Sequence, residues 1–203
     1  QHLERAIDSG LPILLKRPID PNLLSTAGAV VCCASALALG MGEFFIGSIL
    51  LVVGGLFDLV DGVVARHFGV ATPFGAFLDS TLDRLVDMVV LLALVVHYAV
   101  AGDTTMSYVS GVVLVASVLT SYIKARAEAM GISLPGGFVE RGERIFIVAA
   151  GGFFGLMEPA LWLLALASVA TVVQRFEAAR RGLSHEVQDP EVEGNKGEWV
   201  HEK

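Results

Sequence analysis

Four aspartates stand out as residues that could do chemistry in this sequence. They lie in the stretch DLVDGVVARHFGVATPFGAFLDSTLD, at Asp58, Asp61, Asp79 and Asp83, within a chain that is 54% hydrophobic. Residues three or four apart share one face of an α-helix, so each pair of aspartates predicts one acidic ridge. Ionised carboxylates in an apolar, membrane-like setting cost several kcal/mol each, and like charges repel, so a positive partner is required between the ridges.

The chemistry of these ligands indicates what that partner is. Hard carboxylate oxygens, without histidine or cysteine among them, favour Mg²⁺, with Mn²⁺ or Ca²⁺ as alternatives. Four carboxylates can hold two such ions, an arrangement that commonly brackets a phosphate undergoing displacement. A simpler interpretation is available for a single aspartate, and Asp87 could pair with Arg84 three residues earlier. Four aspartates on two glycine-lined ridges favour the metal site.

The elements that position these ridges are membrane helices. Mean hydropathy is +0.68 and only 17% of residues are charged, a composition typical of an integral membrane protein. The predicted fold is therefore all-α, a bundle of six transmembrane helices. The six predicted spans are 23–39, 44–65, 74–100, 106–125, 145–156 extended towards Arg141, and 160–176.

The second and third spans are joined by the short loop RHFGVATP. Helices joined in this way are expected to be antiparallel neighbours, which would bring the four carboxylates together. Glycines at Gly54, Gly55, Gly62 and Gly75 let helices approach closely, as packing within lipid requires. The sequence before the first span, DPNLLS, predicts a helix start with Asn22 or Ser25 as the cap.

Charge predicts the orientation and the domain boundaries. Arginine and lysine gather at alternate ends of the six spans, which places both termini and the aspartates on the cytoplasmic side of the cell membrane. Residues 1–20 predict a short amphipathic helix at the interface, and 21–183 the catalytic domain. Residues 184–203 carry six acids and two lysines, and this tail of net charge −4 is expected to be disordered.

A family resemblance rests on the spacing of the acidic segment. The pattern D-x2-D-G-x2-A-R-x8-G-x3-D-x3-D is satisfied at every fixed position, from Asp58 to Asp83. This resembles the signature of the CDP-alcohol phosphotransferases, integral membrane enzymes of six transmembrane helices that make phospholipids. The six predicted spans agree with that resemblance over most of the chain.

The resemblance implies a role for each matched position. Asp58, Asp61 and Asp79 would bind two divalent cations, and Asp83 would contact the second cation and act as general base. An acceptor hydroxyl would then attack the β-phosphorus of CDP-diacylglycerol and release CMP. The residues that would contact the CDP-alcohol are Asn22, Asp61, Gly62, Ala65, Arg66, Thr72 and Gly75.

A basic cluster beyond the fourth span bears on the acceptor. The segments SYIKARAEAMG and GFVERGERIFI bring Lys124, Arg126, Arg141 and Arg144 to the same side as the aspartates. Such charges could simply meet anionic lipid headgroups, or they could form a pocket for a phosphorylated acceptor. The first segment resembles the inositol-phosphate branch of the family, which implies that the acceptor phosphate is held by Ser121, Lys124, Arg141 and Arg180.

Two other functions are also compatible with these residues. A phosphatidylglycerophosphate synthase also takes a phosphorylated acceptor, glycerol 3-phosphate, and charge alone does not separate it from a phosphatidylinositol phosphate synthase. A different class, a divalent-cation transporter, would also need carboxylates in the membrane, but its path should not be lined by Arg66 and Lys124. The family resemblance implies a homodimer, with CDP-diacylglycerol, a polyol phosphate and membrane lipid as partners and no nucleic acid.

Overall fold

The computed structural model of the protein describes residues 20–67, 69–70 and 72–186, and not the side chains of 65–67, 185 and 186. The described part is entirely helical, as predicted. The predicted interfacial helix of residues 1–20 and nearly all of the predicted tail lie outside the described residues. The helices are α2 (Pro21–Gly40), α3 (Phe44–His67), α4 (Pro73–Val100), α5 (Thr104–Ala129), α6 (Arg141–Phe153) and α7 (Met157–Glu186).

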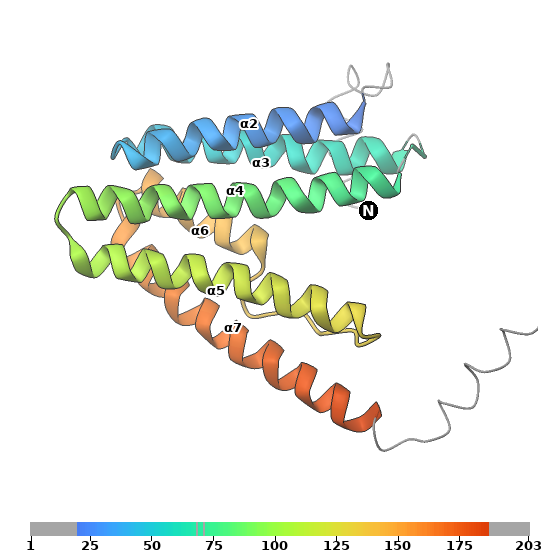
Figure 1. The fold of residues 1–203 in the computed structure, drawn as a ribbon. Coiled ribbons are helices and arrows are strands. Elements are labelled where there is room, and N and C mark those ends of the chain that lie inside the picture. Colours follow the sequence, from blue (N-terminus) through green and yellow to red (C-terminus); the bar gives the residue numbers. More distant parts are fainter. Residues whose placement is uncertain (1–19, 68, 71, 187–203) are drawn as a thin grey trace, which may run out of the picture.

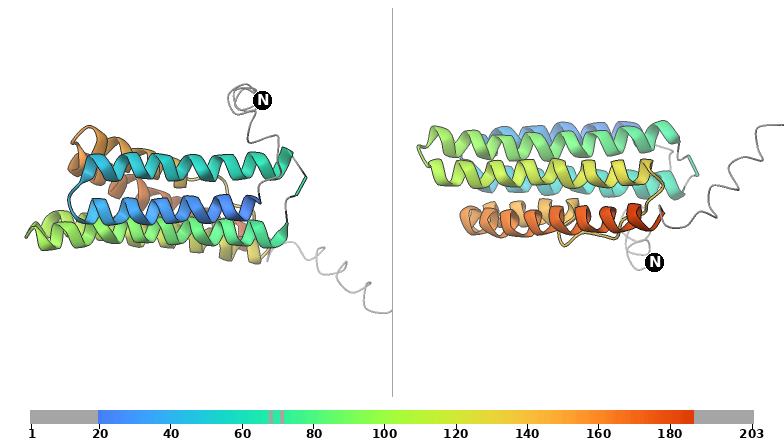
Figure 2. Two further views of the ribbon diagram at one scale, coloured as in Figure 1. Left: turned by 90° about the horizontal axis from the view of Figure 1, so that it is seen from above. Right: turned by 60° about the horizontal axis from the view of Figure 1, so that its bottom comes forward.

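The six helices run alternately up and down and form a closed ring (Figure 1). Going round it, α3 packs on α2, α2 on α4, α4 on α5, α5 on α7, α7 on α6, and α6 returns to α3. The sequence-based prediction that α3 and α4 pack directly on each other is wrong, because among the described residues α2 lies between them (Figure 2, left).

Membrane-spanning character is clearest in four of the helices. By length and composition α2, α3, α5 and α7 are suited to cross a bilayer. Every 18-residue stretch of α4 contains Asp83, Arg84 and Asp87, and α6 has only 13 residues. The number of six transmembrane spans therefore stays a prediction. The last helix continues to Glu186, ten residues beyond the predicted end of the sixth span.

Local sequence signals account for where the helices begin and end. The side chain of Asp20 caps α2 by accepting a hydrogen bond from the backbone N–H of Asn22 at 2.9 Å, so the cap is neither Asn22 nor Ser25. Thr72 caps α4 in the same way, with Pro73 in the first turn. A glycine at positive φ follows each of α2 to α6, two residues past its end.

Helices α2 and α3 cross at a contact made by two glycines. A β-carbon on Gly54 would lie 2.3 Å from the Sγ of Cys32 and 3.0 Å from the carbonyl oxygen of Gly28. A β-carbon on Gly28 would lie 3.0 Å from the carbonyl oxygen of Gly54. The expectation that Gly54 permits close helix packing is thus confirmed, and this contact sets the height of Asp58 and Asp61 one and two turns further along α3.

Replacing Gly54 with alanine should destabilise the bundle by about 1–3 kcal/mol, because the new methyl group meets backbone as well as a side chain. Thermal unfolding of the purified protein in detergent measures the effect. Gly55→Ala is the matched control, since a β-carbon there has nothing within 4 Å and alanine favours the helix. Equal melting temperatures for the two variants would contradict the proposed close contact.

Charge is buried only towards one end of the ring. The core is aliphatic and is built around residues such as Leu39, Leu51, Leu94 and Leu161, all 0% exposed. Among the described side chains, the buried charged residues are Asp61, Asp87, Arg144 and Arg175. All four belong to the end where α3 finishes and α4 and α6 begin, which marks that end for function.

Candidate active site

Three of the four predicted carboxylates converge between α3 and α4. Asp58, Asp61 and Asp79 each offer an oxygen atom, and the three oxygens lie within 4.8 Å of one another. Asp61 is buried, with 5% of its surface exposed, whereas Asp58 and Asp79 are half-buried. Asp58 and Asp61 lie one turn apart on α3, and Asp79 meets them from α4.

The first helix supports the most buried of these carboxylates. Ser25, one turn into α2, donates a hydrogen bond from its hydroxyl to Oδ2 of Asp61. The serine is itself buried, so this bond fixes the direction of the carboxylate in a place that bulk water does not reach. No sequence argument had assigned Ser25 to the site, although its place one turn after Asn22 put it on the correct helix.

Asp83 joins the group through an arginine. Nη1 of Arg141, at the start of α6, lies 2.7 Å from Oδ2 of Asp58 and 2.9 Å from Oδ1 of Asp83. The guanidinium therefore bridges a carboxylate of α3 and a carboxylate of α4. The sequence placed Arg141 in an acceptor pocket, and the structure places it between that pocket and the acidic cluster.

The donor set fits a divalent cation. A hard ion with oxygen ligands at about 2.0–2.6 Å can be shared by oxygens up to about twice that distance apart, and the three carboxylates satisfy this limit. All three ligands are carboxylates, the type that Mg²⁺ and Mn²⁺ accept. The buried Asp61 is turned towards Asp58 and Asp79, so a cation placed among them would neutralise charge that the protein otherwise has to accommodate.

The residues predicted to contact a nucleotide lie beside this cluster. A β-carbon on Gly75 would lie 3.1 Å from Oδ1 of Asn22 and 3.1 Å from Oγ1 of Thr72, so these three positions are neighbours at the start of α2 and α4. Gly62 is half-buried on α3 next to Asp61. The side chains of Ala65 and Arg66 lie outside the described residues, so their predicted roles rest on sequence.

A polar cavity of about 170 Å³ opens on the other side of Asp83, between α4, α5, α6 and α7. Three of the four residues predicted for the acceptor, Ser121, Lys124 and Arg141, line it. Its full lining is Asp83, Arg84, Asp87, Thr120, Ser121, Lys124, Val139, Glu140, Arg141, Arg144 and Arg175. A cavity with this excess of cationic side chains suits a phosphate-bearing ligand.

The predicted acceptor residues leave out two buried arginines of this cavity: Arg144, which the sequence placed only in the wider basic cluster, and Arg175. Arg144 is 5% exposed and Arg175 is 7% exposed, and Nη1 of Arg175 donates to the carbonyl oxygen of Thr120 at 3.0 Å. Arg175 also lies 3.5 Å from the carboxylate of Glu140. A signal was available, because Arg175 falls at the end of an apolar span, where a charged residue indicates a functional site.

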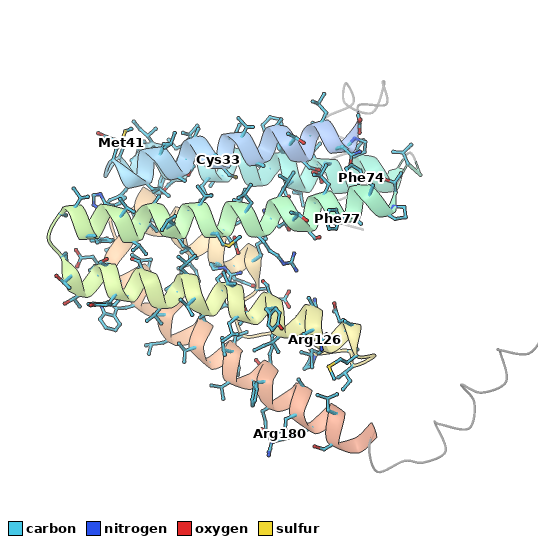
Figure 3. The ribbon with its side chains drawn as sticks, in the orientation of Figure 1. Cys33, Met41, Phe74, Phe77, Arg126 and Arg180 are labelled. Atoms are coloured by element: carbon cyan, nitrogen blue, oxygen red, sulfur yellow. The ribbon has the colours of Figure 1, made fainter. Side chains whose placement is uncertain are left out.

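Arg180, the fourth predicted acceptor residue, is not among the residues that line the cavity. It lies on the last turns of α7, where its guanidinium points away from the bundle (Figure 3). Its Nε and Nη2 donate to the two carboxylate oxygens of Glu177, each at 2.9 Å. The structure thus brings Arg175, and not Arg180, to the place where the sequence prediction expected an arginine from the last helix.

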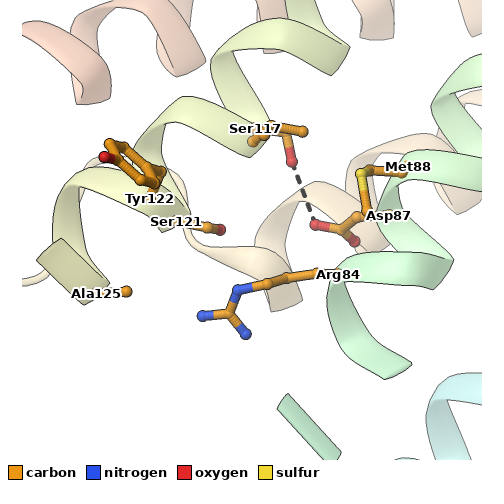
Figure 4. A pocket seen from close by; sticks show the side chains of 8 residues that line it. Arg84, Asp87, Met88, Ser117, Ser121, Tyr122 and Ala125 are labelled. Atoms are coloured by element: carbon orange, nitrogen blue, oxygen red, sulfur yellow. Dashed lines mark hydrogen bonds between the residues drawn. The ribbon is translucent and has the colours of Figure 1, made fainter. Parts of the chain in front are cut away.

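The partner of Asp87 also differs from the simplest expectation, which was a pair with Arg84. Asp87 does not pair with Arg84 on its own helix, because its Oδ2 accepts from Nη2 of Arg144 at 2.9 Å and from Nε of Arg144 at 3.2 Å. Figure 4 shows the Arg84 side chain extending away from Asp87. The pairing across the ring could not be found from helical spacing, since α4 and α6 are far apart in sequence.

A helical membrane bundle that sets a carboxylate cluster beside an arginine-lined cavity defines a membrane-embedded, metal-dependent transferase. Residues 19–174 match the CDP-alcohol phosphatidyltransferase family, and the chain belongs to that family. This membership confirms the resemblance drawn from the aspartate spacing and displaces the cation transporter as an interpretation.

Among curated relatives, the phosphatidylinositol phosphate synthase of Mycobacteroides abscessus is 39% identical over 176 residues, covering 82% of this chain and 80% of the relative. The archaetidylinositol phosphate synthase of Methanothermobacter thermautotrophicus is 35% identical over 180 residues, covering 86% and 88%. The crystal structure of Mycobacterium tuberculosis phosphatidylinositol phosphate synthase with CDP-DAG bound superposes with a TM-score of 0.77 at 36% identity, covering 88% of this chain and 94% of that one. The same enzyme in complex with manganese and citrate gives a TM-score of 0.76, covering 88% and 87%.

Proposed function

We propose that this enzyme transfers the phosphatidyl group of CDP-diacylglycerol to a hydroxyl of inositol phosphate, giving phosphatidylinositol phosphate and CMP. The observation that carries the proposal is the position of Asp83. It lines the cationic cavity, and Arg141 bridges it to Asp58 of the acidic cluster. A hydroxyl held in the cavity would therefore lie next to a carboxylate that can accept its proton, at the border of the metal ligands.

Two divalent cations, Mg²⁺ or Mn²⁺, are proposed as cofactors. Asp58, Asp61 and Asp79 would hold them, with Asp83 at the second ion. When bound, the ions would neutralise the diphosphate of the nucleotide lipid and stabilise the departing CMP. A neighbouring family member has been crystallised with manganese, which supports the choice of ion without separating Mg²⁺ from Mn²⁺.

The residues beside the acidic cluster are proposed to bind and orient CDP-diacylglycerol. Asn22, Thr72 and Gly75 form a small group at the start of two helices. Gly62, Ala65 and Arg66 would continue that surface along α3. The bound CDP-DAG of the M. tuberculosis relative supports a nucleotide-lipid site in this fold.

The proposed acceptor carries a phosphate because the cavity wall is cationic. Lys124, Arg141, Arg144 and Arg175 all line it, and Ser121 adds a hydroxyl. Arginine and lysine form charge-assisted hydrogen bonds with phosphate, which are roughly twice as strong as neutral ones. Inositol phosphate is preferred over glycerol 3-phosphate because two similar proteins are named phosphatidylinositol phosphate synthase and archaetidylinositol phosphate synthase.

An assay of CMP release tests the proposal. Purified protein receives CDP-diacylglycerol and Mg²⁺, together with inositol phosphate, glycerol 3-phosphate, inositol or serine. We expect CMP only with inositol phosphate, and only while EDTA is absent. CMP with glycerol 3-phosphate alone would assign the runner-up activity, and no CMP with any acceptor would refute the enzyme activity proposed here.

Lys124→Gln should raise the KM for the acceptor by about 10-fold or more, because it removes a charged partner of the phosphate. Arg180→Gln is the matched control, since Arg180 pairs with Glu177 outside the cavity and is exposed. Its KM should stay within about twofold of wild type, as exposed ion pairs contribute little. A larger effect at Arg180 than at Lys124 would return Arg180 to the acceptor site.

Location and assembly are further parts of the proposal. Both termini and the active site would face the cytoplasm in the cell membrane, because the arginine-rich ends of the helices lie at the site end of the bundle. Labelling of single cysteines introduced at either end, in intact cells, tests this orientation. A homodimer is proposed from family resemblance, and the mass of the detergent-solubilised protein from light scattering tests it.

A further inference from the structure

A buried ion pair crosses the ring behind the acceptor cavity. Asp87 on α4 is 8% exposed and Arg144 on α6 is 5% exposed. Oδ2 of Asp87 accepts from Nη2 of Arg144 at 2.9 Å and from Nε at 3.2 Å. The proposed reaction assigns nothing to Asp87, although isolating a charged pair from water is costly unless the geometry is favourable.

A third side chain completes the pair. Ser117 of α5 donates from its hydroxyl to Oδ2 of Asp87 at 3.3 Å (Figure 4). The serine is 3% exposed and comes from a helix that packs on α4. One carboxylate oxygen therefore receives bonds from α5 and α6, and Asp87 ties three helices together at the level of the cavity.

The surroundings leave no room for water to replace these bonds from the core side. The space beneath the pair is about 10 Å³ and is walled by aliphatic side chains such as Leu51, Val90 and Val148. A void of that size is at the limit for a single water molecule, which would also need polar partners. On the core side, Asp87 is therefore the group that holds Arg144 in this orientation.

The pair runs parallel to the ion pair of the active site. Asp83 and Asp87 are one turn apart on α4, and Arg141 and Arg144 are one turn apart on α6. All four residues line the acceptor cavity. Because α4 and α6 face each other across the ring, these two ion pairs fix the position of the start of α6 beside the cavity.

We propose that Asp87 is a positioning residue for the phosphorylated acceptor, acting through Arg144; this rests on the proposed function of the cavity. A guanidinium has five N–H donors; Asp87 engages Nε and Nη2, and Arg144 lines the cavity, so its remaining donors are those left for an acceptor phosphate.

Asp87→Asn tests the proposal, because it preserves shape while removing the charge that orients Arg144. The KM for inositol phosphate, measured by CMP release with saturating CDP-diacylglycerol and Mn²⁺, should rise by about 10–100-fold. The KM for CDP-diacylglycerol should stay within about twofold, and the rise in melting temperature caused by Mn²⁺ should match wild type. A purely structural role would lower stability without separating the two KM values.

Two further variants keep the test decisive. Asp87→Glu retains the charge and should recover part of the acceptor affinity, whereas Ser117→Ala removes only the weaker bond and should raise the acceptor KM by about 2–5-fold. Asp103→Asn is the matched control, since Asp103 caps α5 at the opposite end of the bundle. If Asp87→Asn fails to fold, a selective KM change in Ser117→Ala still supports the proposal and its absence overturns it.

Failure of this inference can be told from failure of the proposed function. If wild-type protein releases no CMP with any acceptor, the function is wrong whatever Asp87 does. If wild type is active but Asp87→Asn changes both KM values equally, or neither, the positioning role is wrong and the function stands.

Discussion

Asp83→Asn should reduce CMP release by about 10²–10⁴-fold, the usual contribution of a general base, while the variant still binds metal. The reason lies in where Asp83 sits. It is outside the group of three carboxylates that converge within 4.8 Å, but it lines the cationic cavity proposed for the acceptor. Asparagine keeps the side-chain shape and can still accept from Arg141, yet it has no basic site for the hydroxyl proton.

The measurement combines a rate with a binding readout. CMP release gives the turnover, and the rise in melting temperature on adding Mn²⁺ reports metal binding without requiring the reaction. Metal binding should persist in part in Asp83→Asn. Near-normal turnover would remove Asp83 as the base, and a complete loss of the Mn²⁺ effect would make it primarily a metal ligand.

Asp61→Asn should remove both activity and metal binding, with a loss of turnover on the order of 10³-fold, since several kcal/mol of charge stabilisation depend on the bound metal. Asp61 is the most buried member of the cluster, and Ser25 donates to its Oδ2. An amide oxygen can still accept that bond, so the fold should survive. What disappears is the negative charge that the cation requires.

Asp103→Asn serves as the control for this prediction too, because it makes the same chemical change at a helix cap where asparagine and aspartate are equally favourable. It should retain both turnover and the Mn²⁺ effect. If Asp61→Asn still responds to Mn²⁺ with wild-type affinity, the cation is held elsewhere. The metal centre proposed from Asp58, Asp61 and Asp79 would then be wrong.

Much of the site could be predicted because it is local in sequence. The aspartates come in two pairs three and four residues apart, so helical periodicity alone places each pair on one ridge. Gly54 could likewise be recognised as a contact residue from its size and its place in an apolar helix. The helices themselves follow from long apolar stretches, although the predicted cap of α2 at Asn22 or Ser25 is wrong, since Asp20 is the cap.

The errors concern packing between distant segments. A short loop suggested that α3 and α4 are direct neighbours, but α2 lies between them. Arg180 was assigned to the acceptor by family resemblance, whereas the structure places Arg175 at the cavity and pairs Arg180 with Glu177 outside it. Asp87 was compared with Arg84 since the two are close in sequence, whereas its partner Arg144 is on α6, 57 residues away.

The sequence by itself determined the chemistry: carboxylates at helical spacing, the hard divalent cation that such oxygen donors favour, and the family that this spacing resembles. Only the tertiary structure decided which side chains share a space. It placed Arg141 between Asp58 and Asp83, and it lined the acceptor cavity with Arg144 and Arg175. The physical reason is that periodicity specifies the face of one helix, whereas the order of helices around the ring depends on packing among all six.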